Sequence, residues 1–252
     1  MSIKDLLYPY TAENIHPAFS IDCVILCYYK KKIRVLLSVY FKDYWQLPGG
    51  FMLKHENSEE AARRVLKART GLDDIYLEQF HLFSDLSRHK KTQNIDIINL
   101  HETENKYNST GVEWFYERYV SLGYYAFVKH DDIGLISTGD DKTKWIDVCN
   151  LPTLFLDHND IINTAMMKIQ ALMPMLSVAQ KLLPDKFKMS DLRRIFEIFS
   201  GQTLDRRNFQ RKIMASGKLI QLDETANSSP YNPPILYSFN ENSREVDHIG
   251  YI

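Results

Sequence analysis

Two runs of apolar and β-branched residues lie close together near the start of the chain, at Ile21–Tyr29 and Ile33–Tyr40. Runs of this length and composition are typical of strands. Lys30–Lys32 stand between them and indicate an exposed turn, so the two runs predict a β-hairpin. Cys23 and Cys27 have the same parity in the first run, which predicts two buried thiols on one face.

One amphipathic helix interrupts this series of strands. Asn57 or Ser58 can cap it, Ala61, Ala62, Val65 and Leu66 recur at helical spacing, and Gly71 can end it. The turn-rich segment before it, Trp45–Phe51, is interpreted as a loop. Further strands are expected at Ile75–Phe83, Glu117–Val128 and Lys144–Asp147. Strands and helices mixed in this way predict an α+β fold.

A second helix is expected to begin at Asn159 and to end or bend at Pro174. Its apolar residues follow i, i+3, i+4 spacing, which indicates one buried stripe. The stripe consists of Ile162, Ala165, Met166, Ile169, Leu172 and Met173.

The C-terminal part predicts two short helices followed by two strands. Ser190 can cap the first helix and Gly201 can end it; Thr203 can cap the second, which closes at Ser216–Gly217. Two helices around a short turn that contains glycine match the helix-turn-helix pattern. The strands expected next are Lys218–Leu222 and Ile235–Phe239, with a turn-rich segment between them that is typical of a wing.

The second of these helices has an apolar and a polar face. Phe209 and Ile213 are one turn apart and should face the core, with Arg211 nearly opposite. Arginine can bind guanine and asparagine can bind adenine in the major groove, while border cations suit phosphates. The candidate DNA-binding residues are Lys188, Ser190, Arg206, Arg207, Asn208, Arg211 and Lys212. A basic helix face that is merely solvated is the alternative.

Composition adds a charge asymmetry to this picture. The chain has 252 residues, 44% of them hydrophobic, which is enough for one large or two smaller globular domains. Its net charge is −1, but Lys181–Leu222 carries ten basic and four acidic residues, or +6, which leaves −7 for the rest. A basic module beside an acidic body favours nucleic acid as a partner.

Several classes of protein are disfavoured by what the sequence lacks. Three cysteines make no disulfide framework, and neither a signal peptide nor an apolar run of about 18 residues is present. We therefore expect a cytoplasmic protein without membrane contact. The long polar stretch His89–Trp114 predicts an insertion, either a functional lid or a disordered loop. Its histidines and acids have no metal-ligand spacing, so no metal is expected there.

The segment Gly49–Leu72 carries the fixed residues of a known motif, namely Gly50, Glu56, Arg64, Leu66, Gly71 and Leu72. These residues resemble the Nudix box, G-x5-E-x7-R-E-U-x-E-E-x-G-U, of enzymes that hydrolyse nucleoside-diphosphate linkages with divalent cations. The three other acidic positions hold Val65, Ala68 and Arg69, which cannot hold Mg²⁺. The resemblance implies a Nudix-like fold that has lost its metal, its cofactor requirement and its hydrolase activity.

Nearly the whole chain resembles the Nudix-related transcriptional regulators, with departures at His89–Trp114, in the wing and in the tail from Asn240. The likeness rests on the box and on D-R-R-N-F-x-R-K at Asp205–Lys212. It implies a Nudix-like α/β/α sandwich with a mixed sheet at 1–155, a connecting helix at 156–180 and a winged helix-turn-helix at 181–252. It also implies a homodimer on a palindromic DNA operator, controlled by a small effector.

The effector expected from this resemblance is a pentose sugar, as in the arabinose-responsive type that controls sugar catabolism, or an ADP-ribose-like compound. A pocket without metal carboxylates favours the sugar. The candidate effector-binding residues are Asp22, Trp45, Phe51, Arg88 and Glu117. Asp22 is either a ligand contact or a solvent-facing strand residue.

Two other functions remain open. One is a Nudix hydrolase with an atypical metal site built from Glu56 with Glu59 or Glu60; helix N-terminal charge is the simpler explanation of those two acids. The other is a protein-binding module whose basic helix pairs with an acidic partner.

Overall fold

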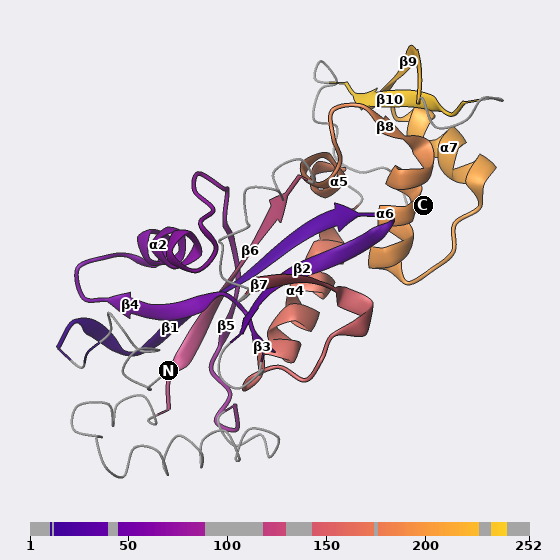
Figure 1. Cartoon of the computed structure of the whole chain (residues 1–252). Coiled ribbons are helices and arrows are strands. Elements are labelled where there is room, and N and C mark those ends of the chain that lie inside the picture. The colour runs from indigo at the N-terminus through magenta and orange to yellow at the C-terminus, as the bar shows by residue number, and fades with distance from the viewer. Residues whose placement is uncertain are drawn as a thin grey trace. The chain divides into compact units, whose positions relative to one another are not determined.

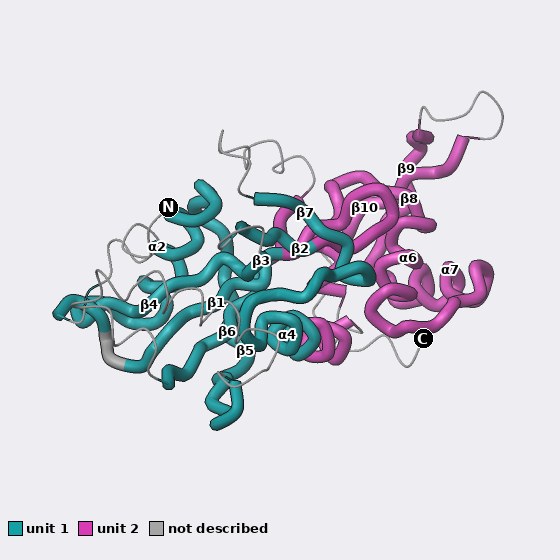
Figure 2. Tube along the Cα trace, turned by 60° about the horizontal axis from the view of Figure 1, so that its bottom comes forward, with its two compact units in different colours: residues 1–25, 35–126, 135–165 teal, residues 26–34, 127–134, 166–252 magenta. Residues whose placement is uncertain are grey.

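The computed structural model describes residues 11, 13–39, 45–88, 118–129, 143–173, 176–226 and 233–240. These residues form two compact units, coloured separately in Figure 2: residues 1–25, 35–126 and 135–165, and residues 26–34, 127–134 and 166–252. No helix among the described residues is long and apolar enough to cross a membrane.

A seven-stranded sheet is built from the predicted hairpin outward (Figure 1). The strand order is β3-β2-β1-β6-β5, with β4 paired to β1 and β7 paired to β2. The bounds are Ile15–Tyr29 for β1, Lys32–Val39 for β2, Trp45–Gln46 for β3, Gly49–Leu53 for β4, Glu78–Phe83 for β5, Val120–Val128 for β6 and Thr143–Asp147 for β7. Cys23 and Cys27 are both fully buried, as their parity predicts, and burial raises the pKa of the Cys27 thiol to about 12.

The segment expected as a loop before the box is largely sheet. Strand β3 pairs with the end of β2, and β4 runs antiparallel to β1 with Asp22 opposite Gly49. The expectation of a loop at Trp45–Phe51 was wrong because the glycines and proline that favour turns are overridden by long-range strand pairing.

Helix α2, Ser58–Thr70, packs beside β4 in the first unit (Figure 1). Asn57 is its N-cap and forms a capping box with Glu60, while Gly71 ends it with φ 74°, a conformation that suits glycine. Its predicted apolar face is buried. The sequence prediction for this helix is confirmed at both ends.

Helix α4, His158–Leu172, follows a short 3₁₀ turn, η4, at Val148–Asn150. Ile162, Ala165 and Ile169 of the predicted stripe are buried, whereas Met167 beside the stripe is exposed. The border between the two units falls inside this helix, between Ala165 and Met166. Pro174 lies outside the described residues.

The second unit contains a helical core covered by a small antiparallel sheet of order β8-β10-β9. Phe196 and Phe209 meet edge to face with ring centroids 5.3 Å apart, and Leu192, Ile195 and Ile213 are fully buried. The elements are α5 at Ser177–Leu182, β8 at Phe187–Lys188, α6 at Met189–Ser200, α7 at Arg206–Ala215, β9 at Leu219–Thr225 and β10 at Ile235–Phe239.

The starts of α6 and α7 differ from the sequence expectation. Helix α6 begins at Met189, one residue before Ser190. Its N-cap residue is Lys188, whose side chain makes no capping hydrogen bond. Helix α7 is capped by Asp205, whose carboxylate accepts the backbone N–H of Asn208, and not by Thr203. Both shifts are small, because any of several polar residues ahead of a helix can serve as its cap.

The tip of the β1–β2 hairpin belongs to the same compact unit as the C-terminal helices. Lys30 and Lys31 form its turn with positive φ angles, and both are exposed, as predicted. The Tyr28 hydroxyl donates to a carboxylate oxygen of Asp191 in α6 at 3.2 Å, and Arg194 donates to the Lys31 carbonyl at 3.3 Å. Burial and, to a smaller extent, the neighbouring Asp191 carboxylate raise the pKa of Tyr28, so its hydroxyl keeps its proton and stays a donor.

Candidate functional site

Helix α7 presents a polar face that no described element covers. Phe209 and Ile213 are 1% and 0% exposed and anchor the helix, while Arg207, Asn208 and Arg211 are exposed. A terminal nitrogen of Arg211 donates to the Asn208 side-chain oxygen at 2.9 Å. The helix therefore carries two hydrogen-bonding side chains already aligned with each other, on the face that the sequence predicts.

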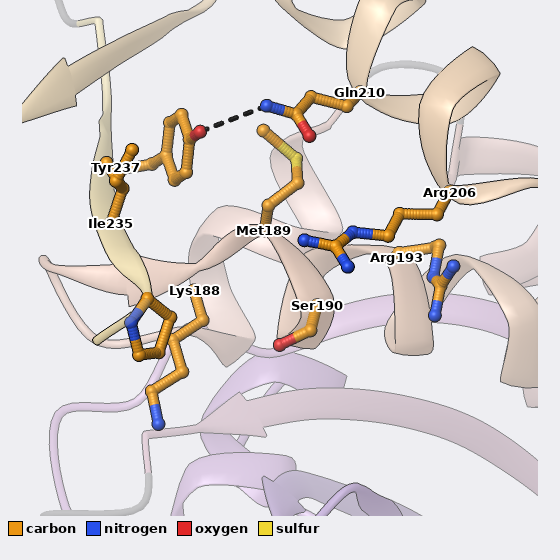
Figure 3. Close-up of a pocket in the computed structure, with 9 residues that line it drawn as sticks. Lys188, Met189, Ser190, Arg193, Arg206, Gln210, Ile235 and Tyr237 are labelled. Atoms are coloured by element: carbon orange, nitrogen blue, oxygen red, sulfur yellow. Dashed lines mark hydrogen bonds between the residues drawn. The ribbon is translucent and has the colours of Figure 1, made fainter. Parts of the chain in front are cut away.

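A basic pocket of about 320 Å³ lies where α6, α7 and β10 meet (Figure 3). Lys188, Arg193 and Arg206 supply its cations, and none of the described residues that line it is acidic. The Gln210 amide donates to the Tyr237 hydroxyl at 3.2 Å, which ties α7 to β10 at the edge of the pocket. The other lining residues are Met189, Ser190, Pro234, Ile235 and Tyr237.

The beginning of α6 adds to the anion affinity of this pocket. Met189 and Ser190 lie in its first turn, which also contains Asp191, and the Lys188 side chain does not cap that turn. Backbone N–H groups at the start of a helix attract anions, because they lack intrahelical partners and face the positive end of the helix dipole. Together with Arg206 and Lys188, this geometry suits a phosphate group.

The Nudix-like box in the first unit has a basic residue in place of an acidic one. Arg69 of α2 is half-buried, and its Nε donates to the Gly49 carbonyl at 3.1 Å. Glu56 is bound by Arg64 through two hydrogen bonds, at 2.8 and 2.5 Å, and accepts the Leu53 N–H at 2.7 Å. Burial raises the pKa of the Glu56 carboxyl, but these hydrogen bonds outweigh it and hold the pKa below its usual value.

A buried polar cluster lies beside the segment Trp45–Phe51, which leads into the box. The Ser121 hydroxyl donates to Asp22, and the Nε2 of His158 lies 3.5 Å from the other oxygen of that carboxylate. His158 also accepts the Leu47 N–H at its Nδ1, at 3.0 Å. A Cβ on Gly49 would overlap the Asp22 carboxylate, so only glycine fits there. Asp22 is thus buried, and the alternative expectation, that it faces solvent from the strand, was wrong.

A buried ion pair continues this cluster. Arg88, 1% exposed, makes two hydrogen bonds of 3.0 Å to Asp157 and donates to the Tyr119 carbonyl at 3.1 Å. Sequence reasoning missed Asp157, His158 and Ser121, because each is far along the chain from its partner and no local pattern marks it. The pairing of β1 with distant segments is what brings them together.

Of the five candidate effector residues, Asp22, Arg88 and Phe51 are buried. Asp22 and Arg88 are held by the buried cluster, and Phe51, 7% exposed, packs edge to face on Tyr119 with centroids 5.1 Å apart. Trp45 is half-buried, with the Lys144 ammonium 5.5 Å from its ring centre. Glu117 lies outside the described residues, as do residues 89–114 and the wing between Thr225 and Ile235 apart from Ala226, Pro233 and Pro234.

Known proteins resemble both parts of the chain. Residues 179–239 match the family model of the NrtR DNA-binding winged helix domain. The ADPR responsive transcriptional repressor NtrR of Acinetobacter baylyi is 23% identical over 88% of this chain and 82% of its own length. An ADP-ribose pyrophosphatase of Methanocaldococcus jannaschii is 27% identical over 60% of this chain and 75% of its own length.

Solved structures have the same fold. Shewanella oneidensis NrtR in complex with a 27mer DNA superposes with a TM-score of 0.65 at 21% identity, covering 88% of this chain and 94% of that one. A MutT/nudix family protein of Enterococcus faecalis gives a TM-score of 0.59 at 23% identity, covering 89% and 88%. The protein therefore combines a Nudix-like α/β domain that has a mixed sheet with a C-terminal winged helix domain.

Proposed function

We propose that this protein is a DNA-binding transcriptional repressor whose Nudix-like domain senses an ADP-ribose-like effector. The observation that carries the proposal is the exposed Arg207–Asn208–Arg211 face of α7 beside a basic pocket, in a segment that matches a DNA-binding winged helix domain. The likeness to the Acinetobacter repressor spans most of both chains and supports the regulatory role.

In this proposal α7 lies in the major groove. Arg207, Asn208 and Arg211 contact base edges there, because arginine and asparagine offer paired donors and acceptors that distinguish bases. The basic pocket receives a backbone phosphate, held by Lys188, Ser190 and Arg206, and Lys212 contacts a neighbouring phosphate. Phosphate contacts fix the register of the helix on the duplex, and base contacts give the sequence preference.

ADP-ribose is the effector that the similar proteins support. The Acinetobacter repressor responds to ADP-ribose, and the Methanocaldococcus pyrophosphatase acts on it. The pentose effector, the arabinose-responsive likeness and the role in sugar catabolism expected from the sequence have no support among these proteins. Of the four candidate effector residues that the structure describes, only Trp45 combines a half-exposed side chain with a place beside the box, so it is the best candidate for stacking on the ligand.

The proposal includes a homodimer on a palindromic operator, since two-fold symmetry in the protein matches two-fold symmetry in the DNA. The proposed DNA partner supports the cytoplasmic location expected from the sequence. The domain limits 1–155, 156–180 and 181–252 stay a prediction, as does the absence of hydrolase activity.

The test is fluorescence anisotropy of the full chain on labelled duplexes from the promoter region of its own gene, with and without ADP-ribose or pentoses. We expect tight binding that unlabelled nonspecific DNA does not displace. Of the ligands, only ADP-ribose should change this binding.

Arg207→Ala and Arg211→Ala should each lower the free energy of DNA binding by about 1–3 kcal/mol and relax the sequence preference. Lys188→Ala and Lys212→Ala should weaken binding evenly across sequences.

The matched control is Arg63→Ala, which removes an exposed arginine from α2. Unchanged affinity in all four variants of the second unit would contradict the assignment of α7 as the recognition helix. If no duplex is bound specifically in any ligand state, hydrolysis of ADP-ribose with Mg²⁺ or Mn²⁺ separates the atypical hydrolase from a module that binds an acidic protein.

A further inference from the structure

The face of α2 that would bear the metal-binding carboxylates carries no acid. Val65 is 1% exposed and part of the core, Ala68 is exposed, and Arg69 is half-buried at the edge of the box. Mg²⁺ requires several hard oxygen ligands in near-octahedral geometry. These three residues offer none from their side chains.

Two of the acids that remain nearby, Glu56 and Glu60, already have other roles. Glu56 is paired with Arg64 and with the Leu53 N–H, and Glu60 accepts the Asn57 N–H as part of the capping box. A metal at Glu56 would have to displace a guanidinium that makes two hydrogen bonds. Among the described residues, no group of three or more histidines, cysteines or acids could hold a metal ion. The box therefore does not fit the divalent cation that its fold family implies.

Arg69 places a fixed positive charge at the same position. Its Nε is bound to the Gly49 carbonyl, and that residue is itself held in β4, opposite Asp22 of β1. The neighbouring Pro48 carbonyl accepts the Cys23 N–H at 2.9 Å, which anchors this segment further. The hydrogen bond to Gly49 uses Nε and leaves the two terminal nitrogens, which make no hydrogen bond to any described residue. Terminal guanidinium nitrogens form the fork that pairs with phosphate oxygens.

We propose that Arg69 replaces the metal: the diphosphate of an ADP-ribose-like effector is bound by this guanidinium, and no divalent cation takes part. The inference rests on the proposed function, and it states how the same domain recognises its ligand. A guanidinium neutralises phosphate charge as a metal does. It provides no metal-bound water, so a ligand held this way is sensed and not hydrolysed.

A purely structural role for Arg69, in stabilising the end of α2, is also testable. A cation in the last turn of a helix is favourable beside the negative end of the dipole. That role would affect the stability of α2 and would leave ligand affinity unchanged. The experiment therefore has to measure binding directly, and thermal unfolding of each variant shows whether the fold is intact.

The experiment is calorimetric titration of the full chain with ADP-ribose, in EDTA and again with excess Mg²⁺. We expect the same affinity in both buffers, within about twofold. Arg69→Gln should weaken binding by about tenfold or more in both, because a charge-assisted contact is lost. Arg69→Lys should recover only part of that loss, since a lysine lacks the fork. Arg63→Gln, on the same helix, is the matched control and should bind like the wild type.

Two results would overturn the role of Arg69 alone: binding that requires Mg²⁺, or an Arg69→Gln variant that binds ADP-ribose as tightly as the wild type. Absence of ADP-ribose binding in both buffers would overturn the effector assignment and this role together. Operator binding, measured on the same protein without effector, shows in that case whether the DNA-binding half of the proposed function still holds.

Discussion

At the scale of single residues, the first unit depends on buried polar groups whose partners are fixed. His158 is 4% exposed, and its Nδ1 accepts a backbone N–H, so the neutral ring carries its proton on Nε2, toward Asp22. Burial lowers the pKa of His158, which outweighs the opposite effect of Asp22 and Asp157, while Arg88 lowers it further. The folded protein thus favours the neutral imidazole.

This shift predicts a loss of stability in acid. An unfolded histidine titrates near its usual pKa of about 6.5, whereas the folded one takes up its proton only at lower pH. The contribution of His158 is therefore fully present above about pH 6.5 and is lost as the pH falls toward the folded pKa. We expect the free energy of unfolding to fall less steeply between about pH 7 and pH 5 in His158→Gln than in the wild type.

Chemical denaturation at several pH values measures this slope. His81→Gln, which removes an exposed histidine, is the control. Parallel curves for the wild type and His158→Gln would contradict a neutral buried imidazole.

At the scale of elements, strand β1 carries residues of both units. Asp22 lies in its part of the first unit, and Tyr28 lies in its part of the second, where the hydroxyl binds Asp191 at the start of α6. A strand is a rigid element, so a change at its box end has a direct covalent route to its Tyr28 end. In the proposed function, β1 is therefore the element through which an effector would bias the DNA-binding helices.

Tyr28→Phe should therefore weaken the response to the effector. Loss of the hydrogen bond to a carboxylate should lower the unfolding free energy by about 1–2 kcal/mol. We also expect ADP-ribose to change operator affinity less than in the wild type, while each ligand alone binds almost normally. Tyr76→Phe is the matched control, because it removes a tyrosine–carboxylate hydrogen bond to Glu78 at an exposed site. An unaltered effector response in Tyr28→Phe would rule out this route.

At the scale of the whole molecule, the proposed regulator joins two binding functions in one chain. A ligand can shift the protein between states only by the difference of its affinities for them. Linkage requires the effect to be reciprocal: if ADP-ribose changes operator affinity by some factor, operator DNA must change ADP-ribose affinity by the same factor.

Titration of ADP-ribose into the protein, with and without saturating operator duplex, tests this equality. We expect the two factors to agree within about twofold, for a coupling of about 1–3 kcal/mol. A nonspecific duplex of the same length is the control. Unequal factors would mean that the two ligands act on different populations, such as different oligomers.

The sequence alone determined the elements whose signals are local. The cap and C-terminal glycine of α2, the C-terminal glycine of α6 and the exposed arginines of α7 all follow from side chains within a few turns of one another, and each prediction is confirmed. Substitutions in the box also predicted the loss of its metal ligands, because that chemistry depends on residue type at fixed helical spacing.

Only the tertiary structure decided what depends on distant partners. Strands β3 and β4 form because β2 and β1 supply their hydrogen bonds, although their own residues favour turns. Asp22, Arg88 and Phe51 are polar or aromatic residues typical of a binding site, yet the fold buries them against His158, Asp157 and Tyr119. Burial and pairing are set by segments far apart in the chain, so no local pattern could assign these side chains to the core or the site.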